Sequence, residues 1–338
     1  MAIMEHLEEL KTLLSRPKDI VITTHRNPDG DAIGASLALF HYLNQLGHTV
    51  HVMAPSEYPD FLAWMPGAAE ILIFDVHTEK GTQWLQHADI IFVLDYNDLE
   101  RVDRMGEIIA PLPCVKVMID HHLYPESFAD YVLSDTSASS TCELIYDFLG
   151  MMGHLNKIDL RVGDSIFTGI LTDTGSFRYS TSPKLFRIVA DLIERGVDDV
   201  RLQDLVFNCM DEKHLRLLGH CLYNRMEILE EFYTGIITLS KEDYEKYAIS
   251  RGDTEGIVNY LLMLKTVKLA AFIHEQPTIT KLSLRSKGAF SVQEIAKQHF
   301  KGGGHKNASG GSSYGGLKAT VKKFKSLLPA YKTQLENT

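Results

Sequence analysis

The chain has 338 residues, of which 45% are hydrophobic and 23% are charged, a composition typical of a globular protein long enough for two domains. No apolar run reaches membrane-spanning length, and the first residues lack the basic start and apolar core of a signal peptide. We therefore expect a cytoplasmic protein without membrane contacts. The formal net charge of -10 also argues against a protein that binds long duplex nucleic acid through many phosphates.

The charge is divided unevenly along the chain. Residues 230–338 carry 16 Lys and Arg against 10 Asp and Glu, so the rest of the chain carries a net charge of -16. This division suggests one part that attracts cations and another that attracts anions. An ordinary imbalance of surface charge would look similar, so the pattern is only supporting evidence.

The first part of the chain alternates apolar strands with helical patterns, which predicts an α/β domain with a mostly parallel sheet flanked by helices. After an amphipathic helix at 4–15, the predicted strands are 20–24, 50–53, 71–74, 90–94 and 115–119. The predicted helices are 32–46, one from about 141 to 149, 160–171, 184–195 and 211–230. Open sheets of this kind bind ligands at the carboxyl ends of their strands.

Metal-capable side chains gather at these predicted ends. His25, Asp29 and Asp31 share one strand-to-helix turn, within the stretch Thr-His-Arg-Asn-Pro-Asp-Gly-Asp at 24–31. Asp95 follows a wholly apolar strand, and Asp120-His121-His122 follows another. Asp173 lies at the end of a helix, where the helix dipole favours a cation, although a turn role beside Gly175 is commoner for Asp.

Together these side chains form a mixed Asp and His set that suits Mn²⁺ and similar divalent ions better than structural zinc. Two ions need roughly six or more ligands, with one carboxylate shared between them at a separation of ~3.5–4 Å. The set is large enough for two ions. Such a pair activates a water molecule for phosphoryl displacement, so no protein nucleophile is required.

The last third of the chain predicts a smaller α/β domain. Strands are expected at 233–239, 268–274 and 278–285, and helices at 291–299 and 321–328. Between these helices lies a glycine-rich stretch, 301–311, in which backbone N–H groups could crowd a phosphate beside Lys and His side chains. A flexible surface loop is the alternative, because the stretch matches no known phosphate-binding fingerprint.

In order and spacing, the stretch 24–34, Asp95, Asp120-His121-His122 and the stretch 172–175 resemble the four motifs of the DHH phosphoesterase superfamily. The glycine stretch, with Ser-Leu-Arg-Ser at 283–286 before it, resembles the DHHA1 substrate domain. The resemblance covers nearly the whole chain, and the compact length is similar to that of the NrnA-type members. It implies a nanoRNase that cleaves short oligoribonucleotides to mononucleotides and also dephosphorylates 3′-phosphoadenosine 5′-phosphate (pAp).

The resemblance also implies roles for individual residues, by position in the motifs. In the first domain His25 and Asp29 would hold one Mn²⁺ or other divalent ion, Asp31, His121 and Asp173 the second, and Asp95 would bridge them. Asp120 would orient its neighbours, and His122 would face the scissile phosphate. In the second domain the substrate's phosphate and nucleotide would be held by Arg285, Ser286, Gly303, Gly304, His305 and Asn307.

The expected domains are a DHH catalytic domain at 1–190, connecting helices at 191–229 and a DHHA1 domain at 230–338, with the active site in the cleft between the two domains. The expected partners are short RNAs, including dinucleotides such as pApA and pGpG, and mononucleotides. A homodimer is left open. Two alternatives stand against this reading: a related phosphoesterase that acts on pyrophosphate or polyphosphate, and a nucleotide-binding protein without turnover.

Overall fold

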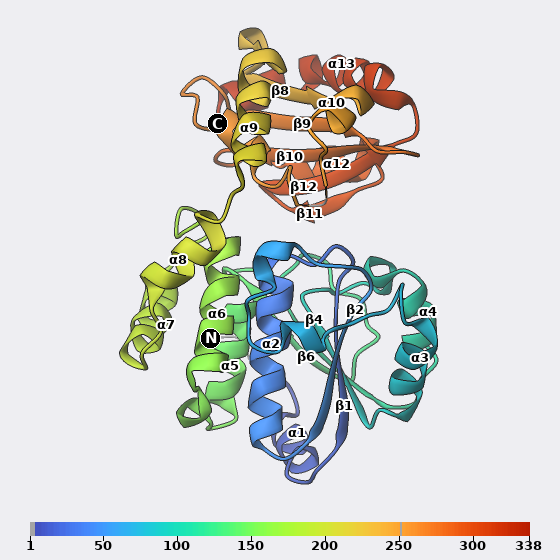
Figure 1. Cartoon of the computed structure of the whole chain (residues 1–338), viewed down its shortest axis with the longest axis vertical. Coiled ribbons are helices and arrows are strands. Elements are labelled where there is room, and N and C mark those ends of the chain that lie inside the picture. The colour runs from blue at the N-terminus through green and yellow to red at the C-terminus, as the bar shows by residue number, and fades with distance from the viewer. Residues whose placement is uncertain (1–3, 251) are drawn as a thin grey trace. The chain divides into compact units, whose positions relative to one another are not determined.

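The computed structural model describes residues 4–250 and 252–338 and divides into two compact units, Met1–Cys209 and Met210–Thr338 (Figure 1). Unit 1 carries a net charge of -16 and unit 2 a net charge of +6. Among the described residues, no helix is long and apolar enough to cross a membrane. The predicted division of the chain at residues 190 and 230 stays a prediction.

Unit 1 is built on a six-stranded sheet in the order β3-β2-β1-β4-β5-β6, and every neighbouring pair is parallel. This confirms the predicted parallel sheet. Its strands are β1 (Asp19–Thr24), β2 (Thr49–Ala54), β3 (Leu72–Ile73), β4 (Ile90–Leu94), β5 (Val115–Asp120) and β6 (Tyr131–Ser134). The four-residue β6 was not predicted.

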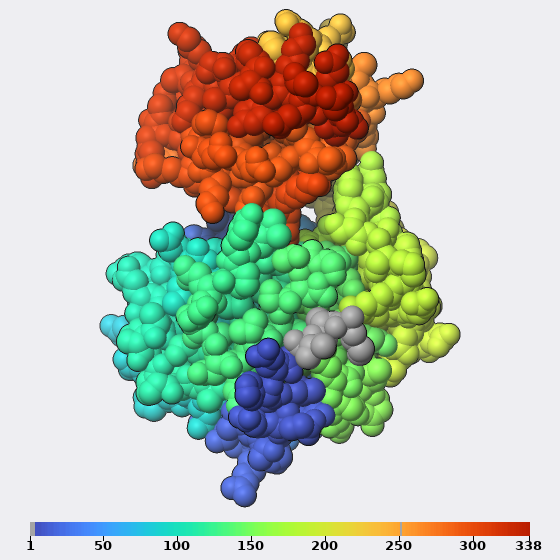
Figure 2. Space-filling view, turned by 180° about the vertical axis from the view of Figure 1, so that it is seen from behind, coloured from blue at the N-terminus to red at the C-terminus, as the bar shows by residue number. Residues whose placement is uncertain are grey.

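Helices cover both faces of this sheet (Figure 1). One face packs against α2 (Gly30–Gln45), α5 (Thr141–Met151), α6 (Leu160–Asp173) and α7 (Pro183–Glu194), and the other against α3 (Thr78–His87) and α4 (Arg104–Ile109). The short α1 (Leu7–Leu13), blue in Figure 2, lies on the surface of unit 1 with Leu10 buried. The last helix of the unit is α8 (Asp199–Phe207).

Strand order reverses between β1 and β4. The chain runs outward from β1 through β2 to β3, then returns to β4 on the other side of β1 and continues to β5 and β6. Ligands bind at such a reversal in open α/β sheets, because the connections leave in opposite directions and open a crevice at the strand ends. His25 directly follows β1 and Asp95 directly follows β4. The two side chains therefore lie at the reversal.

Helices α2 and α6 approach each other closely because their contact is made of glycines. A Cβ atom on Gly34 would lie 2.6 Å from the carbonyl oxygen of Ser165, and one on Gly30 would lie 2.4 Å from the Thr172 side chain. Real Cβ atoms do not come this close to backbone, so larger residues would push the helices apart. The close approach brings Asp31, near the start of α2, next to Asp173, at the end of α6.

Unit 2 contains a second six-stranded sheet, in the order β11-β12-β10-β9-β8-β7, with only β8 and β9 parallel. Its strands are β7 (Met226–Leu229), β8 (Thr234–Leu239), β9 (Leu269–Glu275), β10 (Thr280–Ser286), β11 (Gly303–His305) and β12 (Ala308–Ser313). One face packs against α12 (Val292–His299) and α13 (Gly316–Glu336), the other against α9 (Glu212–Asn224) and α11 (Ile257–Leu261). The remaining helix is α10 (Lys241–Lys246). The predicted smaller C-terminal α/β domain is confirmed.

Three predicted elements of unit 2 were wrong in extent. The helix expected over 211–230 ends at Asn224, and β7 follows as an edge strand. The glycine stretch, considered as a loop, forms most of β11 and β12. Helix α13 runs well past the predicted 321–328 and continues through Pro329, because Leu328 and Leu335 stay buried on one side of it.

Candidate metal centre

The eight side chains selected from the first part of the sequence gather at the carboxyl edge of the unit 1 sheet. Their ligand atoms form three overlapping groups, with the atoms of each group within 4.8 Å of one another. The groups are His25, Asp29 and Asp95; Asp31, His121 and Asp173; and Asp95, Asp120 and His122. The first two match the ligand sets that the family resemblance implied for two ions.

Asp95 lies at the middle of the cluster and is only 2% exposed. Its Oδ2 is 3.2 Å from His25 Nε2, and its Oδ1 is 3.6 Å from His121 Nε2. The two carboxylate oxygens therefore face the two ligand groups. Thr141 Oγ1 donates a hydrogen bond to Asp95 Oδ1 at 2.9 Å. The backbone of Asp95 is in the left-handed region, with φ of 62°, which turns the carboxylate away from the direction of β4.

Asp31 anchors the second group and is completely buried. Its two oxygens accept hydrogen bonds from the backbone N–H groups of Thr141 at 2.6 Å and Cys142 at 2.8 Å, in the first turn of α5. His121 Nε2 lies 3.7 Å from Asp31 Oδ2 and 3.3 Å from Asp173 Oδ2. A helix N-terminus offers unsatisfied N–H groups and a positive dipole, so α5 holds this carboxylate in place.

Sequence reasoning missed this role of α5, although it predicted a helix that begins at about residue 141. Ser140 Oγ accepts a hydrogen bond from the Glu143 backbone N–H at 3.0 Å, and Glu143 Oε2 accepts one from Ser139 N. The cap itself was readable from Ser140 and Glu143, which have the spacing of a Ser cap and a Glu in the first turn. Its partner Asp31 was not, because the pairing depends on how α5 packs against α2.

Asp29 has two tasks. It is the N-cap residue of α2, and its Oδ1 accepts hydrogen bonds from the backbone N–H groups of Asp31 at 3.0 Å and Ala32 at 3.1 Å. This capping fixes the carboxylate beside His25 and Asp95, while Oδ2 makes no bond within the cap.

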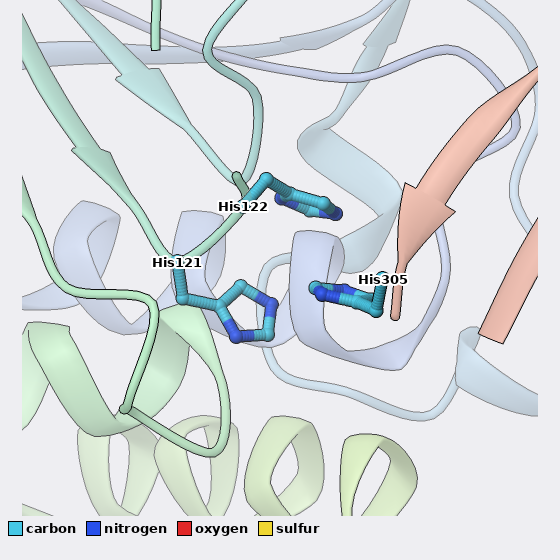
Figure 3. A group of neighbouring side chains, drawn as sticks. All are labelled: His121, His122 and His305. Carbon is cyan, nitrogen blue, oxygen red and sulfur yellow. The ribbon is translucent and has the colours of Figure 1, made fainter. Parts of the chain in front are cut away.

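Asp120 and His122 form a tightly linked pair. Asp120 Oδ1 lies 2.8 Å from His122 Nδ1, and Oδ2 accepts a hydrogen bond from the His122 backbone N–H at 2.7 Å. His121 and His122 project from the segment directly after β5 with differently oriented rings (Figure 3). A carboxylate on Nδ1 fixes the orientation of an imidazole ring, which agrees with the predicted orienting role of Asp120; that role stays a prediction.

The electrostatics of the cluster show a site crowded with negative charge. Burial raises the pKa of Asp31 well above its usual range, and the neighbouring Asp95 and Asp173 carboxylates raise it further. Burial lowers the pKa of His25, but the hydrogen bond with Asp95 and the charges of Asp95 and Asp29 together outweigh this effect, so the pKa lies above its ordinary value. Carboxylates that repel one another around imidazoles are stabilised by divalent cations, which replace the shared protons.

The donor set fits a divalent ion of the manganese type. It consists of carboxylate oxygens and imidazole nitrogens, the ligands that such ions accept. The nearest thiol, Cys142, is not available as a thiolate, because burial and the charge of Asp31 raise its pKa well above its ordinary value. The described residues of unit 1 therefore hold two groups that could bind metal.

In unit 2, three residues predicted to bind substrate lie near the end of β10. Arg285 is partly buried, and Ser286 and Asn307 are bonded to each other through Asn307 Nδ2 and Ser286 Oγ at 2.8 Å. Asn307 Nδ2 also contacts the carbonyl oxygens of Gly288 and Phe290 at 3.1 and 3.0 Å. Both polar groups thus help to hold the turn between β10 and α12, and their contact with substrate stays a prediction.

The two glycines of β11 differ in whether a side chain would fit at their position. Gly304 has a φ of 133°, and a Cβ atom there would lie 2.7 Å from the Ala308 carbonyl oxygen, so only glycine fits. A Cβ atom on Gly303 would meet nothing within 4 Å. His305, labelled in Figure 3, ends the strand. The predicted close approach of a phosphate to Gly303 and Gly304 is therefore sterically open at Gly303.

Comparison with known proteins agrees with this geometry. Residues 19–170 match the model of the DHH family, N-terminal domain, and residues 227–336 match the DHHA1 domain. A solved structure described as an exopolyphosphatase-related protein from Bacteroides fragilis is 40% identical, with a TM-score of 0.93, and the match covers 98% of this chain and 97% of that chain. The chain belongs to the DHH family. The resemblance read from the four motifs is confirmed.

Two curated DHH relatives are named bifunctional oligoribonuclease and PAP phosphatase NrnA. The protein from Thermus thermophilus is 29% identical over 297 residues, which are 88% of this chain and 84% of the relative. The protein from Bacillus subtilis is 26% identical over 310 residues, which are 90% of this chain and 93% of the relative. Both similarities cover too much of this chain to be confined to one of its two units.

Proposed function

We propose that this DHH protein is a metal-dependent hydrolase that cleaves short oligoribonucleotides, including dinucleotides, to mononucleotides and removes the 3′-phosphate of pAp. The observation that carries the proposal is the pair of ligand groups that meet at Asp95, in a chain similar over most of its length to proteins named for these two activities. A protein that only bound nucleotides would not require both groups.

In this proposal Mn²⁺ is the ion held by His25 and Asp29 in one group and by Asp31, His121 and Asp173 in the other, with Asp95 shared between them. When bound, two such ions lower the pKa of a water molecule and stabilise charge on a phosphate. Asp120 keeps His122 oriented toward the phosphate through the 2.8 Å contact at Nδ1.

The second unit supplies the anion-binding part of the proposal. Its net charge of +6 suits the phosphates of a nucleotide, and Arg285 and His305 are the side chains proposed to hold them. Ser286, Asn307, Gly303 and Gly304 would shape the backbone around that phosphate.

Polyphosphate is the second candidate substrate, because the 40% identical Bacteroides fragilis protein is described as exopolyphosphatase-related. Polyphosphate lacks a sugar and a base, so the two substrates place different demands on unit 2. We favour the nucleotide substrate because two relatives that match most of this chain are named as oligoribonucleases.

Purified protein in Mn²⁺, incubated separately with pApA, pAp, pyrophosphate and polyphosphate, tests the proposal. We expect release of AMP from pApA and of AMP and phosphate from pAp, with at least ~10-fold lower catalytic efficiency on pyrophosphate and polyphosphate. Faster hydrolysis of polyphosphate than of both nucleotides would select the second candidate. Absence of hydrolysis of all four compounds would exclude both.

A further inference from the structure

Arg101 is a cation close to the metal centre that is not one of its ligands. Arg101 lies in the short helix η3 (Leu99–Val102), which follows Asp95 in the chain, and its side chain is partly buried. Its carbonyl oxygen accepts a hydrogen bond from the Arg26 backbone N–H at 2.9 Å. Because Arg26 directly follows His25, this bond ties η3 to the turn that carries a predicted metal ligand.

The backbone around Arg101 is fixed from several sides. Asp98 caps η3, with its Oδ1 accepting a hydrogen bond from Glu100 N at 2.7 Å. The Arg26 side chain pairs with Asp103, two residues beyond Arg101. A Cβ atom on Gly106 would lie 2.3 Å from the Leu99 carbonyl oxygen, so α4 packs directly against η3. The backbone that carries the Arg101 side chain is therefore held firmly.

The charge of Arg101 reaches both sides of the centre. The pKa of His122 lies below its ordinary value, chiefly because of burial, and the positive charge of Arg101 lowers it further. The same charge also acts to lower the pKa of His25, although Asp95 outweighs it there. Arg101 thus lies within electrostatic reach of an imidazole from two of the three ligand groups.

Despite this position, Arg101 takes part in no ion pair within residues 4–250 and 252–338. Five carboxylates lie in the centre, and nearby Arg26 pairs with both Asp75 and Asp103. A guanidinium placed to neutralise protein carboxylates would pair with one of them. An unpaired guanidinium whose charge reaches His122 is instead available to an anionic ligand, and its planar donors match phosphate oxygens.

We propose that Arg101 binds a non-bridging oxygen of the scissile phosphate, on the same side as His122. This inference rests on the proposed function and adds a phosphate-contacting residue within unit 1 itself. Its physical basis is charge: unit 1 carries -16, so a side-chain cation close to the centre would attract an anionic substrate in addition to the bound ions. Arg101 supplies that cation and is not itself a member of either ligand group.

Three variants test this assignment: Arg101→Ala, Arg101→Lys and the matched control Arg104→Ala. Arg104 is exposed at the start of α4, three residues further along, and contributes to no ion pair in the described part of the chain. With pApA in Mn²⁺, we expect kcat/KM to fall ~100-fold for Arg101→Ala and less for Arg101→Lys, which keeps the charge but loses the fork of donors. Arg104→Ala should stay within ~2-fold of the unchanged protein.

Two readouts separate phosphate contact from a structural effect. Calorimetric titration should give the same number of bound Mn²⁺ ions for all variants, because Arg101 is not a ligand, and the affinity of Arg101→Ala should be no weaker, because a positive charge near the ions is removed. Dinucleotides with sulfur in place of either non-bridging oxygen should be distinguished by the unchanged protein. In Arg101→Ala the ratio of kcat/KM for the two sulfur isomers should move at least ~3-fold closer to a value of 1. The reason is that the variant has lost the contact with one of the two non-bridging oxygens.

Several results would overturn the assignment. They are kcat/KM of Arg101→Ala within ~3-fold of the unchanged protein, loss of bound Mn²⁺ together with activity, or an unaltered ratio for the sulfur isomers. Failure of the proposed function is a different result, since the unchanged protein would then not hydrolyse pApA. In that case the dissociation constant of AMP in Mn²⁺ decides the inference: it should be at least ~10-fold weaker for Arg101→Ala, and an equal value would refute it.

Discussion

At the scale of single residues, Asp95 joins the ligand groups of the centre. Its two oxygens face His25 and His121, and Thr141 holds one of them in place. If it bridges two ions, no neighbouring carboxylate can replace it. The left-handed backbone at this position also matters for mutagenesis, because asparagine tolerates φ of 62° better than alanine does.

We therefore predict that Asp95→Asn loses at least ~1000-fold in kcat/KM on pApA while its thermal unfolding stays cooperative, because the amide cannot bridge two cations. Asp60→Asn is the control, since Asp60 is an exposed carboxylate at the start of the short helix η1 (Asp60–Leu62). Steady-state kinetics and Mn²⁺ titration of both variants measure the effect. Near-normal turnover of Asp95→Asn would show that Asp95 is not shared between ions.

At the scale of elements, the N-terminus of α5 supports the centre through Asp31. Ser140→Ala removes the cap of α5 and should cost about 1 kcal/mol of stability. It should also weaken Mn²⁺ binding by several-fold, because the N–H groups of Thr141 and Cys142 would hold Asp31 less firmly. Chemical denaturation and Mn²⁺ titration measure the two effects.

Ser182→Ala is a matched control for this prediction. Ser182 caps α7 in the same way, accepting a hydrogen bond from Leu185 N at 3.1 Å, but it has no contact with a predicted ligand. Its loss should cost a similar amount of stability and leave Mn²⁺ affinity unchanged. Equal Mn²⁺ affinities for the two variants would mean that α5 does not position Asp31.

The elements also show where sequence reasoning succeeds and where it stops. The strands that precede His25 and Asp95 were predictable, because each contains a run of apolar residues with polar residues after it. The strands β11 and β12 were not, because glycine has little strand propensity and β12 is held by backbone pairing with β10. The bonds from α5 to Asp31 join residues 110 positions apart, so only the packing of α2 against α5 determines them.

The second unit supplies a prediction about pH and stability. His274 in β9 is buried against Tyr244, and burial together with the charge of Lys281 lowers its pKa to about 4. In the unfolded chain His274 therefore binds a proton below about pH 6.5, whereas in the folded chain it binds this proton only below about pH 4. Stability should consequently fall as the pH drops through this window.

Denaturation of the whole protein at pH 7 and pH 5 measures this effect. We expect His274 to contribute a loss of about 2 kcal/mol between the two pH values, which the variant His274→Phe should not show. The comparison cancels the contributions of other titrating groups, since both proteins share them. Identical pH dependence for the two proteins would contradict a buried, neutral His274.

At the scale of the whole molecule, charge predicts the preferred length of the substrate. Only unit 2 has a net positive charge, +6, and unit 1 carries -16, so the chain offers little continuous basic track for a long strand. We expect 5′-phosphorylated RNAs of two to about five nucleotides to be cleaved at least ~10-fold more efficiently than a 24-mer. A length series at equal concentration of ends measures this, and better cleavage of the 24-mer would contradict it.

The central claim is that two ion-binding groups joined by Asp95 make this protein a phosphoesterase. The most direct measurement strips the protein of metal, adds Mn²⁺ stepwise, and records bound ions and AMP release from pApA in the same samples. The account predicts two bound ions per chain, no activity without metal, and full activity only when both groups are filled. Undiminished activity in the metal-free protein, or a maximum at one bound ion, would contradict it.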